Sequence, residues 1–515
     1  MDIFCRYKIE LPFSEQYVKI TYKCCKGVAV RMFLRNNLGK QPDRQDTVLG
    51  GYPALKIQLY CLLAAGVTEL LFLVLGSLLG YIMYYYVESY LLIPCVLFIG
   101  TILTQGIPRQ AGRQLALGMG MVAWFVITQS QHKMQGMDTQ YIGMFFCTYL
   151  LAFPFASVTQ DGVRQKGLKL IAWCYVAVSM VLVIYSILLL LDLLPSFLEP
   201  YIVWDGARLQ AMWHSNICAC LFMIGIAICF GFFFQAKKVW QKCLLLASAA
   251  LQFGCMALTN CRTSILMTCA LIGGIAFFAI KKNGWKRFAV GFVSALTIMV
   301  ALFAVSSTLY KMNNERLIAK YTEQAASIEE NATDIEADGA DTVETKVLQP
   351  VVNAQGQLQG ANGQSSLSSD LRTLNGRTII WTSALKALRD NSNLLIWGTE
   401  YVGVVISAYN PFEVVHAHNS WAESLFRMGL PGFVFVLVFT GIAIWDALRL
   451  LWKNDDMWKT CIALLVLCVL VAGFLEPFLF SADISYHYLD FIFFLCVGYM
   501  TQWCGENGKN NSTLI

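Results

Sequence analysis

The sequence VHAHNSWAESLFRMGLPG occupies residues 415–432, between a long polar segment and an apolar run over 433–444. Two histidines, an amide and a carboxylate therefore stand where an extramembrane loop enters a bilayer. After the second histidine the spacing predicts a helix, because Trp421, Leu425 and Met428 recur on one face.

His418 is expected just before the first turn of this helix. The free N–H groups and the dipole of a helix start favour a bound anion and a neutral imidazole. A neutral imidazole beside an anion site can act as a general base. Glu423 and Arg427 are spaced as an i,i+4 pair. Of two readings for Glu423, a group that orients the pocket or a solvated helix carboxylate, we favour the second.

Composition makes this chain a membrane protein. Of its 515 residues, 57% are hydrophobic and 14% are charged, against about 25% charged residues in soluble proteins. The net charge of +5 comes from basic residues scattered through short segments, so it does not indicate nucleic-acid binding. The eighteen cysteines fall mostly in apolar runs and none lies between Ser306 and Met428, so we expect no disulfide framework there.

Apolar runs of about 20 residues can cross a bilayer as helices. The predicted fold is all-α and polytopic, with about twelve transmembrane helices and one large extracytoplasmic loop between helices 9 and 10. The expected spans are 57–82, 89–106, 113–129, 139–158, 167–192, 213–235, 240–258, 263–280, 286–306, 430–451, 459–480 and 484–503.

Alternate connecting segments differ in basic content, which sets the orientation. Positive charges mark the cytoplasmic side, so both termini and the basic set face the cytoplasm. The predicted units are a basic tail (1–56), helices 1–9 (57–306), the large outer loop (307–429), helices 10–12 (430–503) and a second tail (504–515). The basic set comprises Arg109, Arg113, Arg164, Lys166, Lys169, Lys237, Lys238, Lys242, Lys281, Lys282, Lys286, Arg287, Arg449, Lys453 and Lys459, against Lys133, Arg208 and Arg262 outside.

The outer loop divides into two halves. From Lys311 to about Leu374 it is acidic and polar, with little to bury, and we expect flexible chain. From Arg377 to Asp390 the spacing predicts an amphipathic helix. Its stripe would lie on the membrane surface or pack on the loop's own fold, and it consists of Trp381, Ala384, Leu385 and Leu388.

Three arginines are the candidate anion ligands. Arg208 and Arg262 stand at the outer membrane edge, and Arg377 starts the amphipathic helix. An arginine at such a place is costly unless paired, which makes it a functional candidate by default. Snorkelling to headgroups is the alternative for one arginine, but three near a His-Asn turn favour a site. All five histidines fall at outer span ends or in outer loops: His132, His214, His416, His418 and His487.

Several of these residues also match known motifs. His418-Asn419, nine residues, Gly429, two residues and Gly432 resemble the signature of the O-antigen ligase and O-antigen polymerase family of bacterial membrane glycosyltransferases. In that family an arginine precedes a small-residue-Asn helix start, a second lies in a Ser/Thr-x-x-Arg-Thr turn, and a Gly-Arg-x-x-x-Trp segment precedes the histidine. The matching positions, within about 200–435, are Arg208 with Asn216, Thr259 with Arg262, and Gly376-Arg377 with Trp381. The sequence departs from the family at Trp213-His214-Ser215, where a proline often precedes the asparagine.

The resemblance implies glycan transfer from an undecaprenyl-diphosphate donor to an acceptor hydroxyl, with inversion and without a metal or other cofactor. It places the reaction at the outer face of the bacterial cytoplasmic membrane. The partners would be the lipid-linked donor, a glycan or lipid acceptor and membrane lipid, with no nucleic acid. Arg208, Arg262 and Arg377 would neutralise the diphosphate. His418 would be the base, and Asn419 would fix the turn or the imidazole tautomer.

A transporter or flippase is the alternative, since about twelve spans suit one. Transporters keep charges near the bilayer midplane and show internal repeats. Here the notable charges lie at the outer face and we find no repeat. The segments outside also lack Asp-x-Asp and any acidic cluster with metal spacing, which disfavours a metal-dependent nucleotide-sugar transferase.

The orientation can be tested by labelling. A cysteine placed at Ser365 should react with a membrane-impermeant maleimide in intact cells, whereas one at Lys237 should react only after permeabilisation. The same chain without the added cysteine gives the background. The reverse pattern at either position would overturn the orientation.

Overall fold

In the computed structural model, the described residues are parts of 116–128, then 161–194, 204–205, 208–209, 215–280, 285–332, 351–352, 358–359, 377–399, 401–410, 413–414, 416–453, 456–480 and 487–512. Within these residues the regular structure is helical apart from two short antiparallel strand pairs. The basic tail and the predicted spans 57–82, 89–106 and 139–158 lie outside the described residues. Of the predicted span 113–129, only short helical pieces are described.

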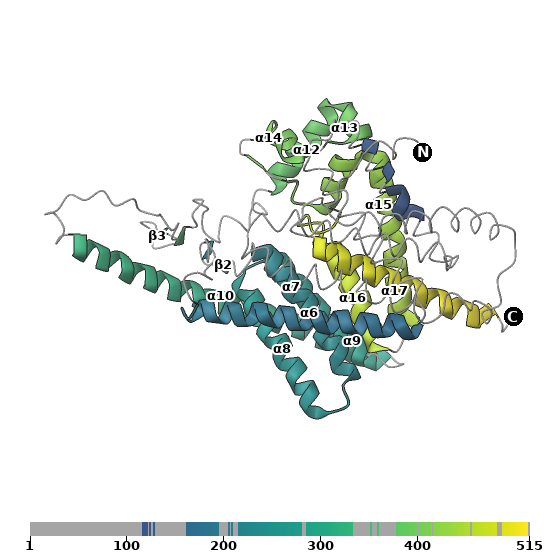
Figure 1. Cartoon of the computed structure of the whole chain (residues 1–515), viewed down its shortest axis with the longest axis horizontal. Coiled ribbons are helices and arrows are strands. Elements are labelled where there is room, and N and C mark those ends of the chain that lie inside the picture. Colours follow the sequence, from purple (N-terminus) through teal and green to yellow (C-terminus); the bar gives the residue numbers. More distant parts are fainter. Residues whose placement is uncertain are drawn as a thin grey trace, which may run out of the picture.

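Among the described residues, eight long helices form the membrane part (Figure 1). Six of them are long and apolar enough to cross a membrane, and α16 and α17 carry shorter apolar stretches. Each overlaps one of the eight spans predicted after residue 160, which confirms the all-α membrane class, while the count of twelve stays a prediction. The helices are α6 (Asp161–Leu190), α7 (Ser215–Gln235), α8 (Val239–Leu258), α9 (Arg262–Ile280), α10 (Trp285–Ala332), α15 (Ser420–Lys453), α16 (Met457–Ala472) and α17 (His487–Ser512).

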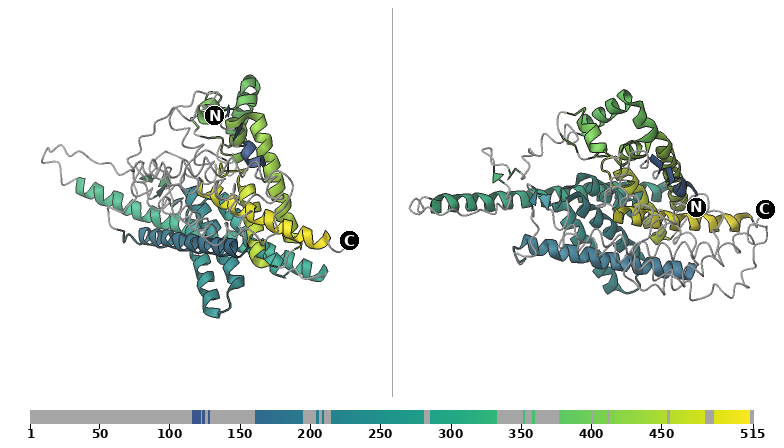
Figure 2. Two further views of the ribbon diagram at one scale, coloured as in Figure 1. Left: turned by 45° about the vertical axis from the view of Figure 1, so that its right-hand side comes forward. Right: turned by 45° about the horizontal axis from the view of Figure 1, so that its top comes forward.

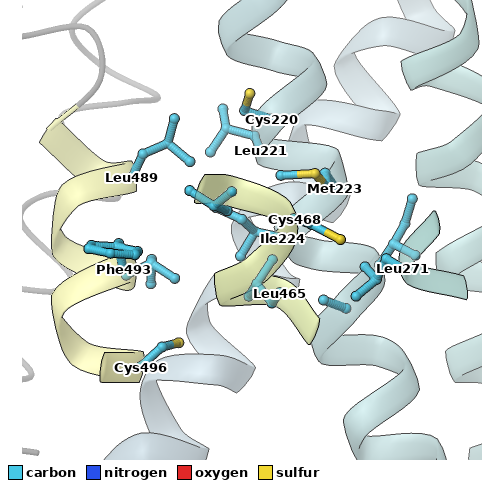
Figure 3. Close-up of a cluster of buried hydrophobic side chains, with 14 of the residues drawn as sticks. Cys220, Leu221, Met223, Ile224, Leu271, Leu465, Cys468, Leu489, Phe493 and Cys496 are labelled. Atoms are coloured by element: carbon cyan, nitrogen blue, oxygen red, sulfur yellow. The ribbon is translucent and has the colours of Figure 1, made fainter. Parts of the chain in front are cut away.

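Helix α7 lies at the centre of the bundle and α10 at its rim. In the most apolar window of α7, 78% of the residues are buried, against 6% in α10. α7 contacts α6, α8, α9 and α16. Figure 3 shows the core where α7 meets α16 and α17, formed by Cys220, Leu221, Met223, Ile224, Leu465, Cys468, Leu489 and Phe493.

A small helical unit stands apart from the membrane helices, at the top of Figure 1. It comprises α12 (Arg377–Asp390), α13 (Ser392–Trp397) and α14 (Val402–Ser407). The predicted helix over 377–390 is therefore confirmed. Its buried stripe packs against α14 and the start of α15, and consists of Ile380, Ser383, Ala384, Ala387 and Leu388. Leu385 points outward with 68% exposure, so its predicted place on that stripe is wrong.

Helix α10 continues to Ala332, well past the predicted end of its span. The expectation of flexible chain is therefore wrong for residues 311–332, and most of 333–376 lies outside the described residues. Contacts with the end of α6 hold the extension. Arg316 Nη2 donates to Leu190 O at 2.6 Å, and Lys320 Nζ pairs with Asp192 Oδ2 at 2.8 Å. The views in Figure 2 show α10 projecting from the bundle.

Helix α15 bends at Gly429, whose φ of 62° is left-handed. The bend frees backbone carbonyls, which are costly without a donor at membrane depth. Trp124 Nε1 donates to Met428 O at 2.7 Å, and Thr399 N donates to Phe426 O at 2.6 Å. Gly432 lies beneath the same tryptophan, since a Cβ there would come within 2.7 Å of Trp124 Cδ1. The bend therefore seats the N-terminal part of α15 against α13.

Gly429→Ala should destabilise the protein. An added Cβ would run into the Ile396 carbonyl oxygen, and the left-handed backbone itself costs a non-glycine residue about 1–2 kcal/mol. Gly441→Ala is the matched control in the same helix, because nothing lies within 4 Å of a Cβ there. Thermal unfolding in detergent should show a lower Tm for Gly429→Ala alone. Equal Tm values for the two variants would contradict the strain.

Candidate functional site

The histidine turn, residues 416–419, leads directly into helix α15. The helix begins at Ser420, as predicted, and Asn419 caps it. Asn419 Oδ1 accepts from the backbone N–H groups of Trp421 at 2.9 Å and Ala422 at 3.0 Å. His418 precedes the cap with a left-handed φ of 50°. Its imidazole is therefore carried on a tight turn rather than on the helix.

Glu423 holds this turn from inside. Its Oε2 accepts from the Ala417 N–H at 2.9 Å, and its Oε1 accepts from Arg427 Nε at 2.8 Å. The i,i+4 pair is confirmed, but the Glu423 side chain is only 1% exposed, so the solvated reading is wrong. Trp381 Nε1 donates to Ala417 O at 3.1 Å. Helix α12 thereby contacts the same turn.

The two histidines lie in contact with each other. Their ring centroids are 4.0 Å apart with an interplanar angle of 62°, and the His418 N–H donates to His416 Nδ1 at 3.3 Å. His416 is thus part of the turn's own structure.

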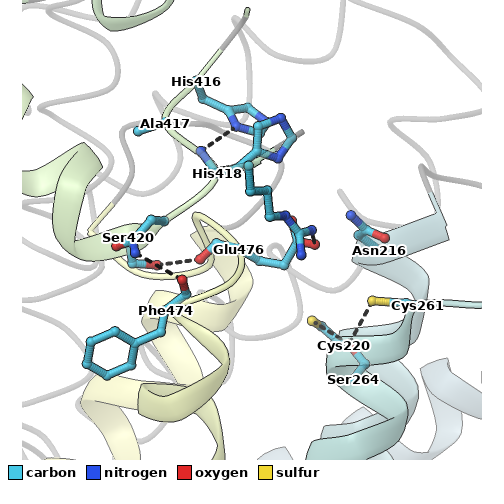
Figure 4. Close-up of polar contacts among 12 residues, drawn as sticks. Asn216, Cys220, Cys261, Ser264, His416, Ala417, His418, Ser420, Phe474 and Glu476 are labelled. Atoms are coloured by element: carbon cyan, nitrogen blue, oxygen red, sulfur yellow. Dashed lines mark hydrogen bonds and ion pairs between the residues drawn. The ribbon is translucent and has the colours of Figure 1, made fainter. Parts of the chain in front are cut away.

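A second turn, residues 473–480, follows α16 and packs beneath the first (Figure 4). Ser420 N donates to Gly473 O at 2.7 Å, and Ser420 Oγ donates to Glu476 O at 2.8 Å. Ser420 Oγ also accepts from Leu479 N at 3.0 Å, while Asn419 Nδ2 donates to Phe474 O at 2.9 Å. Four hydrogen bonds therefore join the start of α15 to this turn.

The second turn carries Glu476, which brings together residues far apart in the sequence. Arg377 Nη2 forms an ion pair with Glu476 Oε1, and the two side chains are 12% and 3% exposed. Asn216, at the start of α7, lies close enough to the Glu476 carboxylate to favour its charged form. Arg208 Nη2 donates to Asn216 Oδ1 at 2.7 Å. Figure 4 shows Glu476 between the histidine turn and Asn216.

Electrostatics at Glu476 reflect this burial. Glu476 lies beyond the end of α16 at Ala472. Desolvation raises the pKa of its carboxyl group, and the guanidinium groups of Arg377 and Arg208 oppose that effect. The ion pair with Arg377 stabilises the charged form of the buried Glu476 carboxylate.

Arg208 and Arg262 flank one tight turn between α8 and α9. Arg208 lies on the strand pair β1 (Trp204–Asp205) and β2 (Arg208–Leu209), and its Nε donates to Thr259 O at 3.1 Å. Arg262, partly buried, is the first residue of α9. It forms no ion pair with any acidic residue that the structure describes. Among the three candidate arginines, Arg262 is thus the cation without a carboxylate partner in the described part of the chain.

The sequence analysis missed Glu476. The signal was available, because an acidic residue near the end of an apolar run is expensive and therefore functional by default. Ser420 was missed as well, and no sequence pattern singled it out. The other three histidines are not part of the two turns described above. His132 and His214 lie outside the described residues, and His487 is the first residue of α17. Among the described residues no cluster of His, Cys, Asp and Glu suits a metal ion.

Left-handed backbone conformations recur in the turns that carry the candidate residues. Of the residues that the structure describes, four non-glycine residues have a left-handed φ: Asp192, Asn260, His418 and Phe480. Asn260 lies in the arginine turn, His418 in the histidine turn and Phe480 at the end of the Glu476 turn. Phe480 is held there by its N–H, which donates to Asp490 Oδ1 at 3.1 Å. Such strained conformations concentrate at functional sites.

Comparison with known families gives one match. Residues 247–437 match the model of the O-antigen ligase family. This stretch includes Arg262, Arg377 and His418 with both glycines of the motif, whereas Arg208, Asn216 and Glu476 lie outside it. No curated protein matches the chain. The match confirms the resemblance drawn from the histidine, arginine and glycine motifs.

Glu423→Ala should loosen the histidine turn. It removes the partner of Arg427 and of the Ala417 N–H, and breaking a buried pair costs about 3–5 kcal/mol. Glu315→Ala is the matched control, since Lys311 and Glu315 form another i,i+4 pair that is 77% and 65% exposed. Thermal unfolding should show a large drop for Glu423→Ala and little change for Glu315→Ala. Similar losses in both would refute the role of burial.

Proposed function

We propose that this membrane protein, whose residues 247–437 match the model of the O-antigen ligase family, transfers a glycan from an undecaprenyl-diphosphate donor to an acceptor hydroxyl. Members of that family are glycosyltransferase-like ligases or polymerases. The observation that supports the proposal is the convergence of Arg208 and Arg377 on one buried carboxylate beside the His418 turn. The reaction would serve surface polysaccharide assembly at the outer face of the bacterial cytoplasmic membrane.

The charge of the site suits a diphosphate. Three guanidinium groups, those of Arg208, Arg262 and Arg377, belong to the proposed site, and Arg262 forms no ion pair with any acidic residue among those described. Arg208 donates to the Thr259 carbonyl and to the Asn216 amide oxygen, which orient its guanidinium group. Guanidinium groups bind phosphate oxygens through paired hydrogen bonds. Positive charge at this position would stabilise the diphosphate as it leaves the sugar.

His418 is the proposed general base. The acceptor hydroxyl attacks the anomeric carbon from the face opposite the diphosphate, its proton passes to the imidazole, and the bond to the diphosphate breaks with inversion. Asn419 and Glu423 support the base by fixing the helix start and the turn before it. Because arginines neutralise the leaving group, the reaction as proposed uses no metal ion.

A transporter or flippase of lipid-linked glycans remains the second candidate. The apolar helices alone are compatible with it. The family match and the histidine turn favour transfer, because moving a lipid-linked glycan requires no general base.

The test compares the two neighbouring histidines. His418→Ala should abolish glycan transfer, because loss of a general base costs about 10²–10⁴ in rate. His418→Asn should be equally inactive, and asparagine tolerates the left-handed backbone, so this variant removes the imidazole without adding strain. His416→Ala should cost much less, since it removes one hydrogen bond within the turn.

The measurement is transfer by purified membranes supplied with lipid-linked donor, with expression and donor binding monitored in parallel. Activity of the unmodified protein should survive a chelator. An active His418→Asn variant would refute the base assignment. Loss of activity in chelator, restored by a divalent ion, would refute the metal-free mechanism.

A further inference from the structure

We propose that Glu476 is a positioning residue, which aims the arginines at the donor diphosphate and fixes their place relative to His418. The inference rests on the proposed function and deepens it. It assigns a role to a residue beyond the stretch that matches the family, on the turn between α16 and α17.

The side chain of Glu476 organises the arginines. It pairs with Arg377 directly, and Arg208, which donates to Asn216, lies close enough to stabilise its charge. Arg377 belongs to the outer helical unit, whereas Arg208 and Asn216 belong to the strand pair and the start of α7. One carboxylate therefore sets the orientation of two guanidinium groups that come from separate parts of the chain.

The backbone of Glu476 is tied to the catalytic turn. Its carbonyl accepts from Ser420 Oγ at 2.8 Å, and Ser420 lies two residues after His418. Glu476 therefore contacts both the turn that carries the proposed base and the arginine Arg377. A general base and a charge clamp that act on opposite faces of one sugar carbon need such a fixed separation.

The turn itself does not depend on the carboxylate. Its backbone is held by Ser420 N to Gly473 O, by Asn419 Nδ2 to Phe474 O, by Leu479 N to Ser420 Oγ and by Phe480 N to Asp490 Oδ1. Removing the charge of Glu476 should therefore leave the turn in place and release the arginines. Those arginines would still attract a diphosphate, because their own positive charges are unchanged.

Glu476→Gln is the decisive variant. We expect kcat per folded protein to fall about 10–100-fold, since a misplacement of about 1 Å can cost 10² in rate. The KM for the lipid-linked donor should stay unchanged or fall. Glu413→Gln, an exposed carboxylate in the segment just before the histidine turn, should keep both constants. A fully active Glu476→Gln protein, or one with a raised KM and normal kcat, would overturn the inference.

A double mutant distinguishes a specific effect of Glu476 on the position of Arg377 from a nonspecific loss of activity. Arg377→Gln combined with Glu476→Gln should lower kcat no more than the worse single variant, because the two residues act as one unit. Additive losses would refute that coupling. Glu476→Asp keeps the charge on a shorter side chain. Its kcat should therefore lie between that of the unmodified protein and that of Glu476→Gln.

Ligand binding and membrane insertion can both be measured without glycan transfer. Undecaprenyl diphosphate without a glycan should raise the Tm of the unmodified protein and of Glu476→Gln alike, and loss of that response in the variant would overturn positioning. If Glu476→Asp inserts into membranes and Glu476→Gln does not, the carboxylate serves folding and the inference fails. An unmodified protein that binds undecaprenyl diphosphate but transfers nothing would refute the proposed function instead.

Discussion

A carboxylate that is withdrawn from water must be paired and hydrogen-bonded, or it destabilises the fold that buries it. Glu476 gathers groups from three distant segments: Arg377 at the start of α12 pairs with it, and Arg208 of the strand pair and Asn216 at the start of α7 stabilise its charge. The same constraint repeats on a smaller scale at Glu423, whose two oxygens take Arg427 and the Ala417 N–H. Glu476 thus joins the small helical unit to the membrane bundle through Arg377, and Glu423 holds the histidine turn from inside.

Hydropathy and spacing were sufficient to predict much of the fold. The membrane helices after residue 160 follow from their apolar runs, and α12 and the start of α15 follow from helical spacing. Spacing could not reveal that Glu423 is buried, because the i,i+4 rule says which residues meet and not which face is covered. It also could not reveal that α10 persists to Ala332. That polar extension is held by tertiary contacts, from Arg316 to Leu190 O and from Lys320 to Asp192, which leave no periodic trace in the sequence.

The candidate site was predicted in its residue types and only partly in its geometry. The motifs singled out Arg208, Arg377 and His418, and the structure brings them to two adjoining turns. Their arrangement depends on left-handed backbone at Asn260, His418 and Phe480. Asparagine and histidine adopt this backbone more often than most residues and phenylalanine rarely does, but none adopts it often enough for the sequence alone to predict it. They persist because surrounding hydrogen bonds, such as Asp490 to the Phe480 N–H, determine the backbone.

The contrast between α7 and α10 bears on how this protein can change over evolutionary time. A side chain in the centre of the bundle must match its neighbours in volume, since close-packed interiors register even one methylene. In α7, 78% of the residues in the most apolar window are buried, so few of its side chains can be replaced without loss of packing. Its first turn also contains Asn216. α10, with 6% buried, is constrained mainly to remain helical and apolar. An apolar-for-apolar substitution should therefore cost little stability along most of α10, whereas the same change in α7 should be costly, so this protein can vary more freely at the rim of its bundle than at its centre.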